Sequence, residues 1–419
     1  MKRIVYLVID LKCFYASVEC VERGLNPFTT NLVVADKTRG KGSNCLAISP
    51  RLKELGVKIR CRLFEIPSDI EYICAKPRMQ EYINKSADIY AIYLKYIAKE
   101  DILVYSIDEC FLDISKYLSL YKKNEFELAK MIIDDVYKTT GICATVGIGT
   151  NMFLAKVALD IISKKSADHI GYLDEEVFKK EIWFHRPITD IWNIGRGIAK
   201  RLAKYDVYDL HGLSLLDEKI LYKEFGINAL HLIEHSKGIE PCTIKDVHNY
   251  KSKSNSLSNG QILFEDYDYS SAFLVVKEMI DLLLLDLREK HLVCKNVGLY
   301  IGYSKDTHSS SGGSTSFDGY TSSSKKIKEA FEKLYHKYTN KDYPIRRISL
   351  SLNDIKDESY ETIDLFYDYE EEKKDKKILD VMIEIKKKYG KNSIMKAMDL
   401  EEKATTIKRN KLIGGHNSE

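Results

Sequence analysis

The sequence has little of what would mark a secreted, zinc-binding or membrane protein. None of its 9 cysteines forms a C-x-x-C pair, so zinc ribbons and disulfide frameworks are not expected. We expect reduced thiols in the cytoplasm instead. The apolar run at the start ends at Asp10, and the richest later run, "MIDLLLLDL", contains Asp281 and Asp286. The sequence therefore predicts neither a signal peptide nor a membrane span, and we expect no membrane partner.

The chain is also poor in net charge and in tryptophan. Its net charge is +3, and it holds 2 Trp against 28 Tyr. The total charge therefore says little about partners, although local basic patches can still bind them. With 419 residues the chain is long for a single hydrophobic core, so we expect two to four domains.

Acidic residues stand at the ends of two apolar segments. Residues 4–9, "IVYLVI", predict a strand covered on both faces, and Asp10 follows it before a helix. Residues 101–115 predict a hairpin whose turn carries Asp108 and Glu109. Taken singly, Asp10 is typical of a helix N-cap, and the pair Asp108–Glu109 is typical of a polar turn. Together they are expected to converge on one point, where two Mg²⁺ ions would offset their repulsion and serve nucleotidyl transfer.

Two aromatic residues follow Asp10 within the next helix, "CFYASVECVER". Phe14 is explained about equally well by packing in the core and by a contact with a bound nucleotide. Tyr15 could instead place its ring under the sugar of a bound nucleotide. A 2′-OH would then clash with the ring, so ribonucleotides would be rejected.

The segment "NIGRGIAKRL" has the pattern of a helix-hairpin-helix. Gly195 and Gly197 would let the backbone approach a DNA phosphate, and positive charge would come from Arg196, Lys200, Arg201 and Lys204. The alternative is an ordinary packing joint between two helices.

The second half of the chain alternates strands and helices like a small α+β domain. Residues 243–262 predict a linker and then a strand, residues 270–290 a helix, and "THSSSGGSTS" a flexible loop. The highly charged residues 368–419 predict a short helix followed by a disordered end.

In this order the motifs resemble the Y-family lesion-bypass DNA polymerases, and in particular the UmuC-like and UvrX-like group of Gram-positive bacteria. The resemblance runs from about residue 3 to residue 360. It is carried by "VIDLKCFYASVE", "LAISPRLKELGVK", "YSIDECFLDIS", "TVGIGTNMFLAKVALD" and "IWNIGRGIAKRL".

The resemblance implies roles for individual residues. Asp10, Asp108 and Glu109 would bind two Mg²⁺, with the carbonyl of Leu11 as an extra ligand. Tyr15 would be the steric gate, with Phe14 beside it against the nucleotide. Two lysines complete the implied nucleotide site. One is Lys53. The other is either Lys164 or Lys165, and the spacing from Asp160 is one residue longer than in the commonest family form.

The sequence departs from the family pattern at Pro50, where many relatives carry a tyrosine that helps to hold the triphosphate. Here that role is either missing or taken over by Ser49 or Arg51. Cys13 also stands where many relatives have an aromatic or small residue. Neither change removes an implied metal ligand.

The resemblance implies an α+β multidomain fold, a right-hand polymerase with a ferredoxin-like palm, small fingers, a helical thumb and an α+β little finger. The expected bounds are 1–19 with 76–175 for the palm, 20–75 for the fingers, 176–242 for the thumb and 243–361 for the little finger. An open site of this kind would add dNTPs to a primer 3′-OH on damaged templates, with low fidelity and without proofreading.

Residues 362–419 would hold a clamp-binding peptide and the charged tail. "TIDLFYD" resembles the bacterial sliding-clamp peptide, with Ile363, Leu365 and Phe366 as apolar anchors; the alternative is a strand end. Accessory proteins of the SOS response are further possible partners. Two rival functions remain open: a non-catalytic DNA-binding escort, which would need a degraded metal site, and a nucleotidyl cyclase, which would need neither a sugar gate nor a helix-hairpin-helix.

Overall fold

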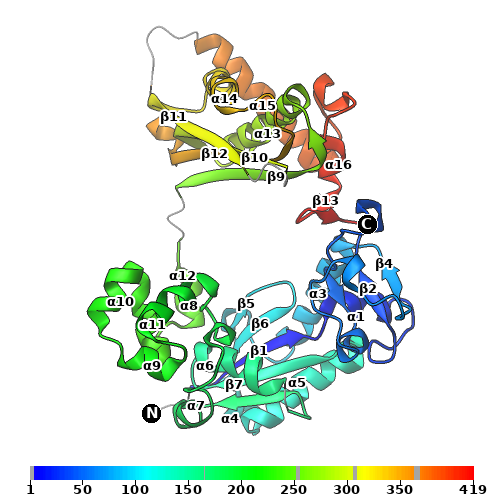
Figure 1. Cartoon of the computed structure of the whole chain (residues 1–419), viewed down its shortest axis with the longest axis vertical. Helices are drawn as coiled ribbons and strands as arrows, with labels where there is room; N and C mark the ends of the chain where they lie inside the picture. Colours follow the sequence, from blue (N-terminus) through cyan, green and yellow to red (C-terminus); the bar gives the residue numbers. More distant parts are fainter. Residues whose placement is uncertain (1–3, 165, 252–254, 305–308, 363–368) are drawn as a thin grey trace. The chain divides into compact units, whose positions relative to one another are not determined.

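The computed structural model describes residues 4–164, 166–251, 255–304, 309–362 and 369–419. The chain forms two compact units (Figure 1). The first comprises Met1–Lys251 with Ser418–Glu419, and the second comprises Ser252–Asn417. Among the described residues, no helix combines the length and the apolar character needed to cross a bilayer.

A five-stranded sheet is the centre of the first unit, and we call it the palm sheet. Its order is β5-β6-β1-β7-β8, antiparallel except for the pair β7–β8. The apolar run at the chain start becomes the central strand, as its continuous hydrophobicity predicts, because both faces are covered. The strands are β1 (Tyr6–Leu11), β5 (Ile102–Val104), β6 (Glu109–Asp113), β7 (Ala144–Gly149) and β8 (Ile170–Leu173).

Helices cover the palm sheet and link it to the smaller parts of the first unit. Those that bear on the site are α1 (Phe14–Val21), α3 (Met79–Leu94), α5 (Glu125–Thr140) and α6 (Met152–Val157). α6 packs Met152 and Ala155 onto β1 and β6. Its other side, with Phe153 and Val157, joins the core of the thumb helices. One short helix is therefore fixed from two directions.

The segments expected to form the fingers and the thumb pack into two different apolar clusters, and the cluster of the thumb segment also includes Phe153 and Val157 of α6. The segment expected to form the fingers contains a small sheet, β2 (Leu32–Val34), β3 (Ala47–Ile48) and β4 (Ile73–Ala75), with helix α2 (Pro50–Glu54). The segment expected to form the thumb contains α7 (Glu175–Glu181), α8 (Arg196–Leu202), α9 (Leu210–Leu215), α10 (Glu218–Phe225) and α11 (Ala229–Ser236).

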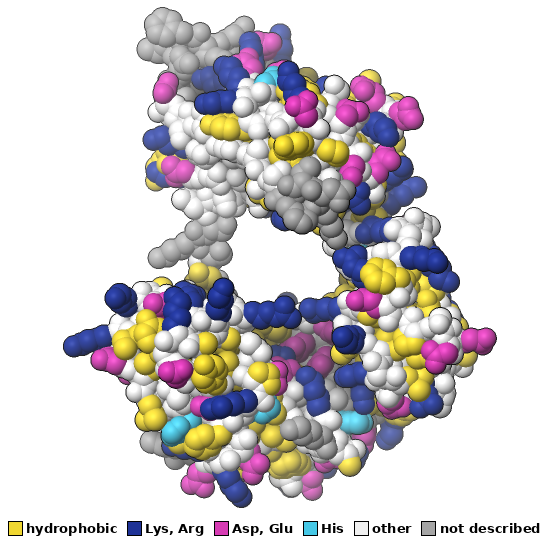
Figure 2. All heavy atoms as spheres, viewed as in Figure 1, with side chains coloured by type: hydrophobic (Ala, Val, Ile, Leu, Met, Phe, Trp, Pro, Cys, Tyr) yellow, Lys and Arg dark blue, Asp and Glu magenta, His cyan; other side chains and the backbone are white. Residues whose placement is uncertain are grey.

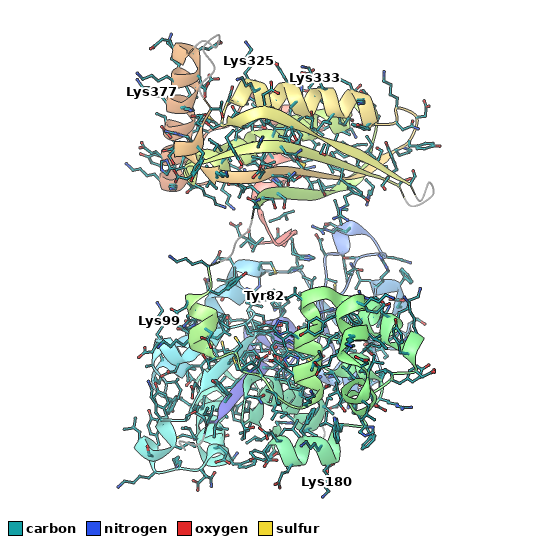
Figure 3. All side chains as sticks on the ribbon, turned by 90° about the vertical axis from the view of Figure 1, so that its left-hand side faces the viewer. Tyr82, Lys99, Lys180, Lys325, Lys333 and Lys377 are labelled. Carbon is teal, nitrogen blue, oxygen red and sulfur yellow. The ribbon has the colours of Figure 1, made fainter. Side chains whose placement is uncertain are left out.

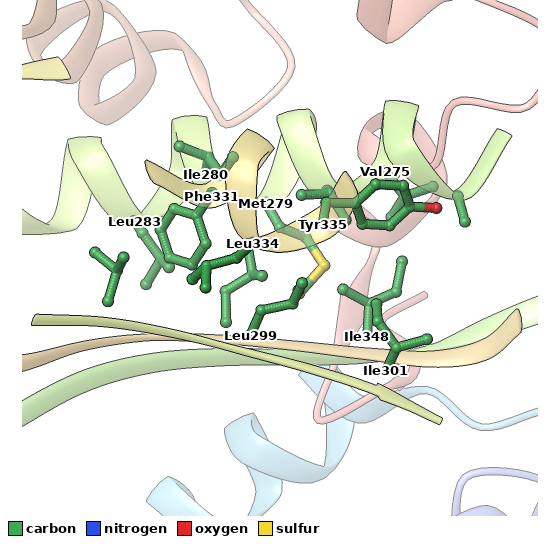
Figure 4. Packing of buried hydrophobic residues seen from close by; sticks show 14 of the residues in the cluster. Val275, Met279, Ile280, Leu283, Leu299, Ile301, Phe331, Leu334, Tyr335 and Ile348 are labelled. Atoms are coloured by element: carbon green, nitrogen blue, oxygen red, sulfur yellow. The ribbon is translucent and has the colours of Figure 1, made fainter. Parts of the chain in front are cut away.

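The second unit is a four-stranded antiparallel sheet, in the order β11-β10-β12-β9, with two helices on one face (Figure 4). Met279 and Leu283 of the first helix and Phe331 and Tyr335 of the second pack onto the sheet in one apolar cluster. The elements are β9 (Ser256–Tyr267), α13 (Tyr269–Glu289), β10 (Leu292–Tyr303), β11 (Ser310–Thr321), α14 (Ser324–Tyr338) and β12 (Ile345–Asp357).

The flexible loop predicted for "THSSSGGSTS" was wrong from Ser310 onward, where the chain forms the edge strand β11 against β10. The polar composition concealed it because an edge strand needs no alternating apolar face. The glycines have a packing role instead. A Cβ on Gly313 would lie 2.4 Å from the Tyr338 ring, so only glycine lets that ring cover the strand.

The predicted disordered end of the tail was also wrong for the residues described. α15 (Tyr369–Tyr389) packs along α13, and Arg288 binds Asp380 with two hydrogen bonds of 2.7 and 2.9 Å. Farther on, Thr405 and Thr406 are buried against Glu278, which is itself 1% exposed. The Glu278 carboxylate accepts hydrogen bonds from both backbone amides and from the Thr405 hydroxyl, at 2.8–3.0 Å.

Glu278→Ala is therefore expected to release the end of the tail and to lower the free energy of unfolding of the second unit by about 2–6 kcal/mol. The buried amides of Thr405 and Thr406 would be left without an acceptor, at about 1–3 kcal/mol for each unsatisfied group. Hydrogen exchange at residues 397–417 would report the release. Glu289→Ala is the matched control, because Glu289 also joins α13 to the tail, through Lys387 at 2.7 Å, but on the surface. Equal protection in both variants would contradict the assignment.

Candidate active site

Asp10, Asp108 and Glu109 lie at one end of the two central strands of the palm sheet. Asp10 of β1 is directly opposite Glu109 of β6 in the antiparallel register. Directly opposed residues point to the same face of a sheet, so the two carboxylates share a face. The backbone amide of Leu11 donates to the Asp108 carbonyl at 2.9 Å, which ties the turn to β1. The three carboxylates therefore occupy one edge.

The closeness of these acids changes their ionisation. Burial, and then the charges of Asp108 and Glu109, raise the pKa of Asp10 from 3.8 to about 7. Burial also raises the pKa of Glu109, against the opposing charge of Lys156. Groups held near one another against their own repulsion favour the binding of a cation.

Lys156 is the main residue of this site that the sequence reasoning missed. It is buried on α6, and its Nζ donates to Glu109 Oε2 at 2.9 Å and to Asp160 Oδ1 at 3.2 Å. Burial lowers its pKa, but the charges of Asp160 and Glu109 outweigh burial and raise it. The spacing Lys156–Asp160 is the one signal that the sequence offered, since residues four apart meet on a helix.

Two glycines of β7 allow α6 to come close enough for this ion pair. A Cβ on Gly147 would lie 2.0 Å from the carbonyl oxygen of Ala155, and one on Gly149 would lie 2.2 Å from its amide nitrogen. No side chain fits in that gap. Directly after α6 the chain continues as a π-helix, Ala158–Ser163, which carries Asp160. Such wide turns occur often at functional sites.

The carboxylates fit a divalent metal ion by their chemistry. Hard carboxylate oxygens are the ligands that Mg²⁺ prefers. Glu109 Oε1 is buried and has no hydrogen-bond partner among the described residues, so a bound cation would satisfy it. Within the same part of the chain no three acidic, His or Cys side chains form a complete metal cluster. Glu109 Oε2 is turned to Lys156, and Asp108 Oδ1 accepts from the Ser106 hydroxyl at 2.6 Å.

Tyr15 stands on α1 at the edge of the acidic cluster, whereas Phe14 is 3% exposed and packs in the core. Burial and then the charge of Asp108 raise the pKa of Tyr15, so its hydroxyl lies within electrostatic reach of that carboxylate. The Tyr15 ring stacks on Tyr82 of α3 with the centroids 4.5 Å apart and an interplanar angle of 17°. Tyr82 lies in the interior of the first unit (Figure 3). The sequence reasoning missed Tyr82 because nothing in the α3 pattern distinguishes it from a core residue.

The lysines implied for the triphosphate are placed differently from one another. Lys53 is exposed on α2, and its charge lowers the pKa of Cys13 against the larger effect of burial, so it faces the start of α1. Lys164 is exposed, with its Nζ 3.9 Å from Asp160 Oδ1. Lys165 lies outside the described residues.

Ser49, one of the two candidates to replace the tyrosine that many relatives have at the position of Pro50, is buried and its hydroxyl is already hydrogen-bonded. Ser49 is the N-cap of α2 and is 0% exposed. Its hydroxyl donates to the Thr30 carbonyl at 2.7 Å and accepts from the amides of Leu32 and Leu52. Arg51 remains as a candidate, since it is exposed and its one ion pair among the described residues is with Glu54, at 3.4 Å.

The turn predicted to approach DNA is exposed in the thumb. Gly195 is the N-cap of α8, and a Cβ on Gly195 or Gly197 would meet no described atom within 4 Å. Internal packing therefore gives no reason for glycine here. Arg196 and Lys200 are exposed, and Figure 2 shows basic side chains on the surface of the thumb. Arg201 is instead held internally, by the Glu224 carbonyl at 2.7 Å and over the Phe225 ring.

Comparison with known proteins decides the family. Residues 9–160 match the impB/mucB/samB family and residues 254–365 match the C-terminal domain of that family. The chain is 34% identical, over 98% of its length and 97% of the relative, to a Bacillus subtilis protein named for UV-damage repair, UvrX. It is 30% identical to DNA polymerase IV 2 of the same organism, over 99% of both chains. The chain belongs to the impB/mucB/samB family. This is the family of the Y-family DNA polymerases, and its enzyme class is DNA-directed DNA polymerase.

The fold of this polymerase agrees with its family. A solved Y-family DNA polymerase chimera of Dbh and Dpo4 superimposes with a TM-score of 0.61 at 20% identity, over 84% of this chain and 99% of the other. The α+β multidomain fold expected from the sequence is confirmed. Y-family polymerases use DNA and dNTPs and generally depend on divalent metal ions. The clamp-peptide residues Ile363, Leu365 and Phe366 lie outside the described residues.

Proposed function

We propose that this polymerase performs error-prone translesion synthesis, adding dNTPs to a primer 3′-OH at Asp10, Asp108 and Glu109 with two Mg²⁺ and without proofreading. The observation that carries the proposal is the register that sets Asp10 opposite Glu109, with Asp108 tied to β1 beside them. The relatives named for UV-damage repair and as DNA polymerase IV support the damage-response role.

The residues of the chain have distinct parts in this proposal. Bound Mg²⁺ would activate the primer hydroxyl and neutralise charge on the triphosphate. Asp10, Asp108 and the carbonyl of Leu11 would hold the ions, together with Glu109 through Oε1, which has no hydrogen-bond partner among the described residues. Lys53 and Lys164 would meet the triphosphate, with Lys165 as the alternative to Lys164. Tyr15 would lie under the sugar and exclude a 2′-OH.

DNA would be held mainly by backbone contacts. The exposed turn of the thumb would receive a phosphate at Gly195 and Gly197, with charge from Arg196 and Lys200. Contacts of this kind carry no sequence information, which suits an enzyme that must accept damaged template. The proposed place of action is the cytoplasm.

We extend the proposal to a sliding clamp as partner, with SOS accessory proteins as further candidates. The apolar pattern of Ile363, Leu365 and Phe366 begins directly after Thr362. Thr362 is fixed to β11 by two hydrogen bonds with Tyr320, of 2.9 and 3.0 Å. The peptide would therefore start from a fixed point of the little finger.

Primer extension by the purified wild-type protein tests the proposal. With Mg²⁺ and four dNTPs we expect short, distributive extension on an undamaged template and passage of an abasic site. A primer with a mismatched 3′ end, incubated without dNTPs, is expected to keep its length. Shortening of that primer would contradict the absence of proofreading, and a stop at the abasic site would contradict bypass. No extension at all, even with clamp added, would favour the escort function.

A further inference from the structure

Tyr82 forms the floor on which the Tyr15 ring rests. The two rings are close to parallel, at 17°, and their centroids are 4.5 Å apart. Tyr15 is half-buried, whereas Tyr82 is 0% exposed. A ring with a flat partner on one face can neither move toward that partner nor slide far in its own plane while the stacking is kept.

Tyr82 is itself locked by a buried charge. Its hydroxyl donates to Glu19 Oε1 at 2.8 Å, and Glu19 is 0% exposed. Arg78 binds both oxygens of that carboxylate, at 3.0 and 3.1 Å, and Arg23 contacts it as well. Burial raises the pKa of Glu19, but the hydrogen bonds from Arg78, Tyr82 and Arg23 outweigh burial and lower it. The carboxylate is therefore a charged, fully satisfied acceptor.

The interactions close a loop between two helices. Glu19 lies one helical turn after Tyr15 on α1, and Tyr82 on α3 touches both residues. A completely buried carboxylate carries a desolvation penalty, and an apolar side chain could fill the same space without it. What this carboxylate does is fix the orientation of one tyrosine, and that tyrosine supports another.

We propose that Tyr82 is a positioning residue for sugar discrimination, which holds the Tyr15 ring in the place where a 2′-OH would clash. The inference rests on the proposed function, in which Tyr15 lies under the sugar of the nucleotide. Without its support the Tyr15 ring could retract into the space left by Tyr82. Discrimination would then fall even though Tyr15 is still present, because selectivity depends on where the ring lies to within a fraction of an ångström.

The test is the ratio of kcat/KM for a ribonucleotide to kcat/KM for the matching deoxynucleotide, measured in the full-length protein. Tyr82→Leu is expected to raise this ratio roughly 10- to 100-fold, the range in which small changes of a pocket alter selectivity. Tyr82→Phe, which keeps the ring and removes only the bond to Glu19, is expected to raise it less. Because both substrates are measured on one enzyme sample, loss of active protein leaves the ratio unchanged.

Two further variants separate positioning from general loosening of α3. Ile89→Ala removes another fully buried side chain of α3 that has no ring contact or hydrogen bond to Tyr15 or Glu19 among the described residues, and the ratio should stay at the wild-type value. In a Tyr15→Ala background, Tyr82→Leu should add nothing, because a support has no effect once the supported ring is gone.

Each outcome has one meaning. An unchanged ratio in Tyr15→Ala would overturn the sugar gate of the proposed function. A raised ratio in Tyr15→Ala with a wild-type ratio in Tyr82→Leu would overturn the support alone, and so would an equal rise in Ile89→Ala. If Tyr82→Leu does not fold, Tyr82→Met, which fills the space without a ring, carries the test, and a wild-type ratio in that variant refutes the inference.

Discussion

Asp10→Asn is expected to abolish primer extension and, in the absence of metal, to make the protein more stable at pH 8. Activity is lost because the amide carries no charge for a metal ion, although it has the shape of the carboxyl group. Stability rises because Asp10 is held near Asp108 and Glu109, and burial and repulsion raise its pKa to about 7. The site is therefore under electrostatic strain that the isosteric amide removes.

The pH dependence of this effect has a definite direction. The pKa of Asp10 is raised above its ordinary 3.8, so the folded state favours the protonated form. Below pH 3.8 the residue is neutral in both states and costs nothing. The cost grows between pH 3.8 and 7 and is complete above pH 7, at about 1.4 kcal/mol per pKa unit, or on the order of 4 kcal/mol.

Thermal melts in a chelating buffer would measure the difference in Tm between Asp10→Asn and wild type at pH 5 and pH 8. We expect the larger difference at pH 8, and we expect added Mg²⁺ to stabilise the wild type more than the variant. Asp88→Asn, on the exposed side of α3, is the matched control and should extend primers normally. Extension by a folded Asp10→Asn protein, or a Tm difference that is the same at both pH values, would contradict the assignment.

Lys156→Met is expected to lower both activity and stability. Methionine retains much of the length of the side chain but leaves Glu109 and Asp160 without their shared cation. Removing one partner of a buried ion pair costs about 3–5 kcal/mol. The pKa of Glu109 would rise further, and loss of a residue that orients a metal ligand commonly lowers metal affinity or activity by about 10- to 100-fold.

Lys164→Met is the control for that variant, because Lys164 approaches the same carboxylate of Asp160 from the solvent side. An exposed pair contributes at most about 1 kcal/mol, so its free energy of unfolding should stay close to wild type. If Lys164 meets the triphosphate, the KM for dNTP should rise in this variant. Urea unfolding and steady-state kinetics measure both. Equal loss of stability in the two variants would show that the buried ion pair of Lys156 with Glu109 does not stabilise the protein more than the exposed pair of Lys164 does.

The sequence predicted those parts of the fold whose cause lies in the chain itself. The continuous apolar run before Asp10 supplies the central strand β1, in which Tyr6, Leu7, Val8 and Ile9 are all buried. The hairpin that carries Asp108 and Glu109 places these acids at one end of the sheet. Their closeness to Asp10 could therefore be predicted from the positions of the strand ends alone.

Other features depend on partners far away in the sequence. The strand β11 has no apolar period, and its partners β10 and Tyr338 belong to other segments of the sequence. From the sequence, Lys156 is predicted to be a solvated charge on a helix. In the structure its Nζ lies 2.9 Å from Oε2 of Glu109, which is 47 positions earlier in the chain. Ser49 looked available for a ligand, but its hydroxyl is used in capping a helix and fixing a strand.

The attachment of the tail through Glu278 also bears on how this protein can be recombined. Residues 252–417 form one compact unit, and the end of the tail satisfies a carboxylate on the first helix of that unit. A graft of the little finger that stopped at residue 361 would therefore leave the Glu278 carboxylate of α13 without its hydrogen-bond donors Thr405 and Thr406, and it would remove the helix α15 that packs along α13. The transferable module is the longer one, and exchanges of this unit between relatives should succeed when the crossover lies near residue 252 and the donor supplies the chain as far as residue 417.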